Sequence, residues 1–192
     1  MKETLTQPTT AQLEAEMARV SYRLRFGRVL RSTIYALVIV AAAAVLIATL
    51  WLPILQIYGS SMTPTLEEGE IVVAAKGSRF DTGDVIAFYY NNKMLVKRVI
   101  ASAGQWVNID EDGTVYVDNV KIDEPYLTEK AFGDCDLKLP YQVPDGRLFV
   151  MGDHRATSVD SRNTVVGCVA EEQIVGKIVF CVWPMERLGR VS

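Results

Sequence analysis

Residues 84–103 read DVIAFYYNNKMLVKRVIASA, and they place two β-branched and aromatic runs on either side of the asparagine pair at 91–92. Val, Ile, Phe and Tyr are enriched in strands, whereas asparagine tolerates the positive φ angles that tight turns need. The stretch therefore predicts two strands joined by a turn. Because side chains alternate along a strand, the second run would place Leu95, Lys97 and Val99 on one face.

Further runs of the same kind surround this stretch. They are IVVAA at 71–75, TVYVDN at 114–119, RLFVMGD at 147–153, VVGCV at 165–169 and IVGKIVFCVWP at 174–184. Pairs of glycine, aspartate and asparagine lie between several of them, as turns between strands require. Residues 123–147, with three prolines and little periodicity, predict a long surface excursion instead. Residues 54–192 are thus expected to form one mainly β domain.

A single apolar run precedes this domain. Residues 34–52, IYALVIVAAAAVLIATLWL, contain no charged side chain, and Pro53 follows them. These nineteen residues, at about 1.5 Å each in a helix, would span most of a hydrocarbon core of about 30 Å. The run is longer than the roughly 7–15 apolar residues of a cleavable signal peptide, so residues 32–53 are predicted to be an uncleaved transmembrane signal anchor. A buried helix of a soluble domain is the alternative.

The flanks of this run predict its orientation. Five arginines follow the last acidic residue before it: Arg19, Arg23, Arg25, Arg28 and Arg31. Because basic flanks stay inside, residues 1–31 are expected to be cytoplasmic and the β domain extracytoplasmic, with one pass through the cell membrane. Helical spacing of apolar residues between 9 and 28 predicts an amphipathic helix, which would either lie on anionic membrane lipid or form a soluble juxtamembrane stub.

Charge and cysteine usage exclude several classes of function. The first 31 residues carry 6 basic and 3 acidic side chains, which leaves 14 basic and 20 acidic ones for the remainder. Such an acidic domain is unsuited to binding nucleic acid, which requires a basic surface. The spacing of Cys135, Cys168 and Cys181 matches no zinc site, so no metal is expected. These cysteines could supply one disulfide, between Cys135 and Cys168, or be small buried side chains.

The stretch GSSMTPTL at 59–66 contains two candidate serine nucleophiles. Pro64 lacks a backbone N–H and favours extended geometry at Thr63, so the two serines are expected on an exposed bend and not inside a helix. A serine nucleophile needs a base. The chain has one histidine, His154, which lies in the charged stretch MGDHRATSVDSR.

Lys97 is the alternative base. Its predicted strand face is otherwise apolar, and burial lowers the pKa of a lysine, so a neutral amine could accept a serine proton. The other interpretation is that Lys97 and Arg98 decorate an exposed edge strand. If Arg98 is buried instead, it needs a carboxylate partner, for which Asp153 and Asp160 are candidates.

Four motifs together carry a family resemblance. They are SMTPTL at 61–66, GDVIAF at 83–88, KRVIASAG at 97–104 and GDHRATSVDSR at 152–162. In order and spacing they resemble four boxes of the type I signal peptidase family, and VWPMERLG at 182–189 is similar to the closing stretch of that family. The resemblance implies the signal-peptidase-type β-fold, with a β-barrel core like that of self-cleaving repressors, behind one N-terminal membrane helix.

The resemblance also implies a serine/lysine dyad. Ser61, the serine directly before Met62, falls on the nucleophile, and Lys97 falls on the general base. Ser158 matches the serine that orients the lysine amine. Gly59 stands where Gram-negative members have a serine and is similar to the Gram-positive type, so the oxyanion would depend more on backbone N–H groups.

The last motif supplies the supporting polar groups that the resemblance implies. Asp160 and Arg162 match a supporting pair, and Asp153 matches the carboxylate that partners Arg98. His154 stands where the family pattern usually has asparagine, so the resemblance implies that it is a bystander.

The substrates that the resemblance implies are secretory preproteins whose signal peptides end in a small-x-small motif such as Ala-x-Ala. No cofactor is implied, and the enzyme would work beside the secretion translocon. The anchor supports this independently, because Ser61 follows Leu52 by nine residues, which reach at most about 30 Å. The nucleophile would then stay near the outer membrane surface.

Three alternatives accompany this interpretation. The first is a specialised peptidase for a narrow set of substrates such as pilins. The second is a self-cleaving regulator of the same fold, although the anchor and the acidic charge do not suit its DNA-binding partner domain. The third is a catalytically silent relative, which would be expected to lack the serine or the lysine.

Overall fold

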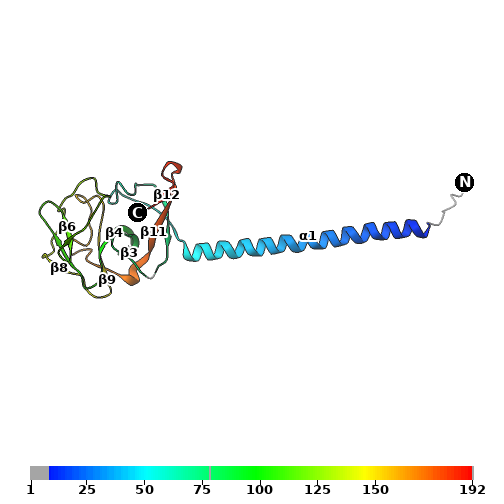
Figure 1. Cartoon of the computed structure of the whole chain (residues 1–192), viewed down its shortest axis with the longest axis horizontal. Helices are drawn as coiled ribbons and strands as arrows, with labels where there is room; N and C mark the ends of the chain where they lie inside the picture. The colour runs from blue at the N-terminus through cyan, green and yellow to red at the C-terminus, as the bar shows by residue number, and fades with distance from the viewer. Residues whose placement is uncertain (1–8, 78, 192) are drawn as a thin grey trace. The chain divides into compact units, whose positions relative to one another are not determined.

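The computed structural model describes residues 9–77 and 79–191 of the 192-residue chain. Residues 1–8, which belong to the expected cytoplasmic segment, lie outside the described residues. The chain divides into two compact units, Met1–Ala48 and Thr49–Ser192. The described part of the first unit is helical, and the strands belong to the second (Figure 1).

Helix α1 runs without a break from Thr10 to Trp51. It joins the expected amphipathic segment and the expected membrane anchor, because residues 10–51 contain no proline that would stop the helix before Pro53. By length and composition, α1 is the one helix of the described residues that could cross a membrane. Its 42 residues, at about 1.5 Å each, measure roughly 60 Å, so the basic half extends beyond what a hydrocarbon core requires.

The second unit is built on two antiparallel sheets, as the β-rich runs predicted. In the larger sheet the strand order is β1-β2-β11-β3-β4-β9-β10, and β12 pairs with β11. Its strands are β1 (Ile54–Gln56), β2 (Ile71–Ala75), β3 (Val85–Tyr90), β4 (Lys93–Ala101), β9 (Arg147–Met151), β10 (Val169–Ala170), β11 (Ile174–Trp183) and β12 (Gly189–Arg190).

The smaller sheet has the order β7-β6-β5-β8. Its strands are β5 (Trp106–Ile109), β6 (Val115–Val117), β7 (Val120–Lys121) and β8 (Tyr141–Gln142). Two short 3-10 helices, η1 (Glu171–Gln173) and η2 (Met185–Arg187), flank β11 in the sequence.

The stretch 84–103 forms the expected pair of strands, β3 and β4. They pair in antiparallel register, with Tyr90 opposite Lys93. The two asparagines between them have φ angles of 44° and 61°, in the left-handed region that asparagine tolerates. This turn fixes the register of β4 and therefore the face on which Lys97 lies.

The strand expected at 165–169 is wrong for most of its length, because β10 begins only at Val169. The residues before it turn instead. The carbonyl of Asn163 accepts hydrogen bonds from the amides of Val166 and Gly167, at 3.0 and 2.9 Å. Local turn chemistry thus overrides the strand propensity of the valines.

The excursion at 123–147 is irregular, as expected, but it is not confined to the surface. Strand β8 lies within it. Its side chains Phe132, Leu137, Leu139 and Tyr141 pack against the core that β5, β6 and β9 share. The excursion therefore covers part of the hydrophobic core.

A second part of the core lies beneath the bend that follows Ser61. Met62 and Leu66 are buried there and pack with Val72 of β2 and Ile178 of β11. Burying a side chain of this size contributes about 1.5–3 kcal/mol. The exposed bend is therefore anchored to the sheet by its own apolar residues.

Among the edges of the larger sheet that have no strand partner in the described residues are those of β4 and β1. Strand β4 pairs with β3 along its length, but its pairing with β9 begins only at Arg98, which leaves residues 93–97 free on that side. Strand β1 pairs with β2 alone. Both edges can therefore still form hydrogen bonds with another chain segment.

All three cysteines are free. The disulfide considered between Cys135 and Cys168 is therefore not formed, and Cys168 and Cys181 are small buried side chains of the core, whereas Cys135 is half-buried. Denatured protein prepared without reductant should therefore react with a thiol reagent at three sites, and a pre-reduced sample should give the same count. A count of one thiol would contradict this arrangement.

Candidate active site

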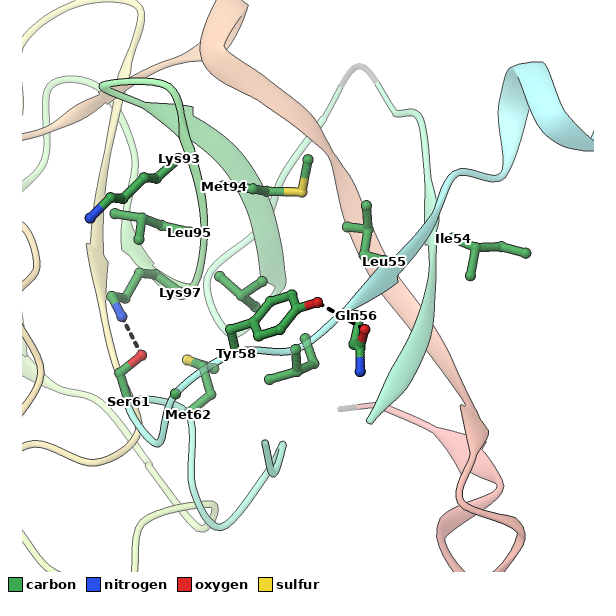
Figure 2. A pocket seen from close by; sticks show the side chains of 13 residues that line it. Ile54, Leu55, Gln56, Tyr58, Ser61, Met62, Lys93, Met94, Leu95 and Lys97 are labelled. Atoms are coloured by element: carbon green, nitrogen blue, oxygen red, sulfur yellow. Dashed lines mark hydrogen bonds between the residues drawn. The ribbon is translucent and has the colours of Figure 1, made fainter. Parts of the chain in front are cut away.

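The structure brings Ser61 and Lys97 together from the segment after β1 and from the middle of β4. Lys97 Nζ lies 2.5 Å from Ser61 Oγ, within hydrogen-bond distance (Figure 2). Lys97 is 3% exposed, whereas Ser61 is partly exposed. A buried amine therefore contacts a hydroxyl group that a ligand can reach.

The surroundings of Lys97 lower its pKa. Burial lowers the pKa of Lys97 from 10.5 to about 8, although the carboxylates of Asp160 and Asp153 act in the opposite direction and Arg162 lowers it further. The alternative of an exposed edge-strand lysine is wrong, because the side chain is buried. Roughly a tenth of such amines are uncharged at pH 7, so the group can accept a proton from Ser61.

Ser61 lies in a closed loop, residues 57–70, which we call the Ser61 loop. The Ile57 amide donates to the carbonyl of Glu70 at 2.8 Å, and the Gly69 amide donates to the carbonyl of Ile57 at 2.9 Å. Gly59 has a φ of 82°, a conformation that favours glycine. Hydrogen bonds thus connect the two ends of the loop, and Ser61 lies two residues after the bend at Gly59.

A second loop, residues 152–162, lies against the first. The amide of Gly152 donates to Asp160 Oδ2 at 2.9 Å. Arg162 binds both oxygens of the Asp160 carboxylate at 2.9 Å and donates to the carbonyl of Phe132 at 2.8 Å. The expected pair of Asp160 and Arg162 therefore fixes the shape of this loop and connects it to the excursion.

Arg98 ties β4 to the same loop. Its Nε and Nη2 bind the two carboxylate oxygens of Asp153 at 2.9 and 2.8 Å, with both side chains buried. Thr65 Oγ1 also contacts Asp153, and the ring of Tyr126 stacks on the guanidinium at 3.8 Å. Of the two carboxylates considered for Arg98, Asp153 is the partner.

Ser158 is buried in the 152–162 loop, beside the backbone of Gly152. Its Oγ has no hydrogen-bond partner among the described residues. The structure thus places Ser158 near the site without a hydrogen bond to Lys97, and its expected role in orienting the amine stays a prediction.

A role for the His154 side chain as the base has little support in this geometry. His154 Nδ1 lies 2.6 Å from Thr157 Oγ1, and the contact of His154 with Ser61 runs through its backbone N–H, which donates to the Ser61 carbonyl at 3.1 Å. Within residues 9–77 and 79–191, no group of three or more His, Cys, Asp or Glu side chains could hold a metal ion.

Sequence reasoning missed several residues that shape the site. Arg155 pairs with Glu124 of the excursion and donates from Nε to the carbonyl of Gly152 at 3.1 Å. Gly152 itself has no room for a side chain, and Tyr126 covers Arg98. Arg155 in GDHRATSVDSR was the available sequence signal. Its partner Glu124 comes from an irregular segment whose position cannot be predicted from the sequence.

A pocket of about 580 Å³ opens beside Ser61 and Lys97. One wall is β1 with the residues that follow it, and the other is the free edge of β4 (Figure 2). Its lining consists of Ile54, Leu55, Gln56, Ile57, Tyr58, Gly59, Ser61, Met62 and Lys93 to Lys97. Most of these side chains are apolar, so the pocket suits an extended apolar segment more than a charged small molecule.

Comparison with known proteins gives one family. The family described as "Signal peptidase, peptidase S26" matches residues 30–183, which include every site residue described above. Signal peptidase I of Bacillus licheniformis is 36% identical over 170 residues, covering 82% of this chain and 90% of that protein. Signal peptidase I of Bacillus caldolyticus is 38% identical over 77% of this chain and 90% of that protein. Thylakoidal processing peptidase 1 of Arabidopsis thaliana is 33% identical over 70% of this chain and 43% of that protein.

Replacing Gly152 by alanine should destabilise the fold. A Cβ atom there would lie 2.2 Å from Ser158 Oγ and 2.5 Å from the Ser61 carbonyl oxygen, so both loops would have to shift. Overpacking of this kind costs about 1–3 kcal/mol, which lowers the melting temperature by roughly 2–12 °C in a chain of this size.

Gly189→Ala is the matched control for Gly152→Ala, because a Cβ at Gly189 meets nothing within 4 Å. Thermal unfolding of both variants in the same detergent should separate them. Equal melting temperatures would show that the contact between the two loops is not crowded at Gly152.

Proposed function

The chain belongs to the signal peptidase family, peptidase S26, and we propose that it is a membrane-bound serine endopeptidase which removes signal peptides with a Ser61/Lys97 dyad. Membership of this family makes it a signal peptide-removing peptidase. The observation that carries the dyad is the contact between the buried Lys97 amine and the Ser61 hydroxyl.

The reaction begins when Ser61 Oγ attacks the scissile carbonyl carbon of the substrate. Neutral Lys97 takes the hydroxyl proton, and the carbonyl oxygen becomes an oxyanion. Backbone N–H groups, including that of Ser61, are the proposed donors to this oxyanion, because Gly59 offers no side-chain hydroxyl. Lys97 then protonates the leaving amine, which is the new N-terminus of the mature protein.

The second half of the reaction releases the signal peptide. An ester now joins the signal peptide to Ser61, and Lys97, again neutral, takes a proton from a water molecule that attacks this ester. The tetrahedral intermediate collapses, the signal peptide leaves with a new carboxylate, and the proton returns to Ser61. Lys97 thus alternates between base and acid in both halves.

The supporting residues hold the dyad and balance its charge. When Lys97 carries the serine proton, the carboxylates of Asp160 and Asp153 stabilise the ammonium, since both raise the pKa of Lys97. Ser158 is the proposed group that orients the amine, and its Oγ has no hydrogen-bond partner among the described residues that would compete for it.

The pocket suggests how a signal peptide is selected. An extended peptide between β1 and the free edge of β4 could form strand hydrogen bonds on both sides. Alternate side chains of that peptide would point in the same direction, toward one set of apolar side chains of the pocket. This explains a requirement for two small residues separated by any residue, the small-x-small pattern, before the cleaved bond.

Helix α1 provides the proposed membrane anchor, with the basic N-terminal side in the cytoplasm and the β domain outside. Strand β1 begins at Ile54, three residues after α1 ends. The substrate pocket therefore begins within a few residues of the anchor. We expect preproteins to be cleaved at the outer membrane surface, in contact with lipid and close to the translocon.

Ser61→Ala and Lys97→Met should each lower kcat by at least about 10³-fold, because dyad residues act as a unit. His154→Ala and Ser60→Ala are the controls and should stay within threefold of the unmodified protein. The assay uses detergent-solubilised full-length protein, a preprotein with an Ala-x-Ala site, and mass spectrometry of the product N-termini. Cleavage that persists in Ser61→Ala would exclude this nucleophile, and loss of cleavage in folded His154→Ala would restore histidine as the base.

The pH dependence of kcat/KM should report the titration of Lys97. Only the deprotonated amine can accept the serine proton, so kcat/KM should rise about tenfold per pH unit below a pKa of about 8 and level off above it. His154→Ala should leave this profile unchanged. A profile that stays flat into acid pH would show that Lys97 is not the essential base.

A further inference from the structure

Arg187 lies far from Ser61 in the sequence but contacts the loop that carries it. It is the last residue of η2, after β11, and the resemblance to the family assigned it no role. Its side chain is 32% exposed and contacts the Ser61 loop beside a cavity that Pro64, Thr65 and Glu70 line.

The guanidinium of Arg187 makes four contacts with this one loop. Nη2 donates to the carbonyl oxygens of Pro64 and Thr65, at 2.9 and 3.0 Å. Nε lies 2.8 Å from Glu70 Oε1, and Nη1 lies 2.5 Å from Glu67 Oε1. The first two contacts are hydrogen bonds and the other two are ion pairs, since neither Glu70 carboxylate oxygen has a hydrogen-bond partner in the described residues. A planar guanidinium can form all four contacts at once, whereas a lysine ammonium cannot match them.

The contact with Glu70 compensates a buried charge. The Glu70 side chain is 3% exposed, and Arg187 is the cation that forms an ion pair with it among the described residues. A buried carboxylate that loses its cation is costly, so the pair fixes where η2 and the end of the Ser61 loop meet.

Thr65 is consequently held from two directions. Its hydroxyl contacts Asp153 and Arg98 from the 152–162 loop and β4, and its carbonyl accepts from Arg187. The Leu66 amide donates to the carbonyl of Met62 at 2.9 Å, which connects Thr65 to the residue that follows Ser61. Displacement of the loop at Thr65 would therefore displace Ser61 Oγ.

We propose that Arg187 is a positioning residue that holds the Ser61 loop at the distance where Ser61 Oγ meets Lys97 Nζ. It acts through the backbone of Pro64 and Thr65 and touches neither reacting atom. This inference rests on the proposed dyad, because the position of Ser61 matters for kcat only if Ser61 is the nucleophile.

The test compares three variants of the full-length protein in detergent. Arg187→Lys keeps the charge opposite Glu70, and Arg187→Gln removes it. Arg190→Gln changes a neighbouring arginine that lines the same cavity but whose side chain forms no hydrogen bond or ion pair with the described residues. A misplacement of about 1 Å can lower a rate by 10²-fold, so kcat should fall about 10- to 100-fold in both Arg187 variants, with KM within threefold. Arg190→Gln should keep the rate of the unmodified protein.

Melting temperatures separate positioning from stability. Arg187→Lys should melt closer to the unmodified protein than Arg187→Gln, since the charge pair survives, yet its kcat should stay low. A kcat that recovers fully in Arg187→Lys, or a rise in KM alone, would overturn the proposal.

Hydrogen exchange can test the positioning role of Arg187 without substrate, and so independently of the cleavage assay. Hydrogen exchange of the amides in residues 57–70, followed by mass spectrometry, should be faster in both Arg187 variants than in Arg190→Gln. Unchanged exchange would overturn the positioning role. If the unmodified protein fails to cleave preproteins, the proposed function falls, and the exchange result still decides whether Arg187 holds the loop.

Discussion

A lysine amine held out of water against a serine hydroxyl is the constraint on which the rest of this structure depends. Burial is the largest influence that lowers the pKa of Lys97, but the site also contains two carboxylates that raise it. Each of these carboxylates accepts hydrogen bonds from the Nε and Nη2 groups of one arginine. Asp153 is bound by Arg98, and Asp160 is bound by Arg162. Arg162 also lowers the pKa of Lys97, so part of the amine is neutral near physiological pH, and the two carboxylates stabilise it once it is charged.

Three buried arginine–carboxylate pairs hold the segments around Ser61 and Lys97, and they matter more for geometry than for stability. Buried ion pairs often contribute little net free energy, because desolvation offsets the attraction, although removing one partner costs about 3–5 kcal/mol. Two of these pairs connect segments that are distant in the sequence, and the third acts within one loop. One joins β4 to the 152–162 loop, one joins that loop to the excursion at 123–147, and one closes the loop on itself. Together they fix the two loops that meet at Ser61.

The local parts of this architecture could be predicted from the sequence, and the long-range parts could not. The hairpin of β3 and β4 follows from adjacent strand-forming runs and an asparagine turn, and α1 follows from an uninterrupted apolar run. The turn at Asn163 was missed because the side chain and the carbonyl of Asn163 accept hydrogen bonds from the amides that follow it. These local bonds outweigh the strand propensity of the neighbouring valines. Burial of Lys97 was left open by the residues themselves, since it depends on which segments cover β4. The sequence did not indicate that position 152 requires glycine. The requirement comes from the close approach of Ser158 and the Ser61 carbonyl, which leave no room for a side chain.

The free edges of β1 and β4 have a consequence for the range of sequences that this protein can process. Every peptide offers the same backbone N–H and C=O groups, so an edge that recognises them is indifferent to most side chains. On the proposed function, discrimination then falls to the few positions whose side chains enter the pocket. On the proposed function, a single site of this kind could serve a whole secretome of unrelated precursors, and evolution could diversify those precursors freely everywhere except at two small residues.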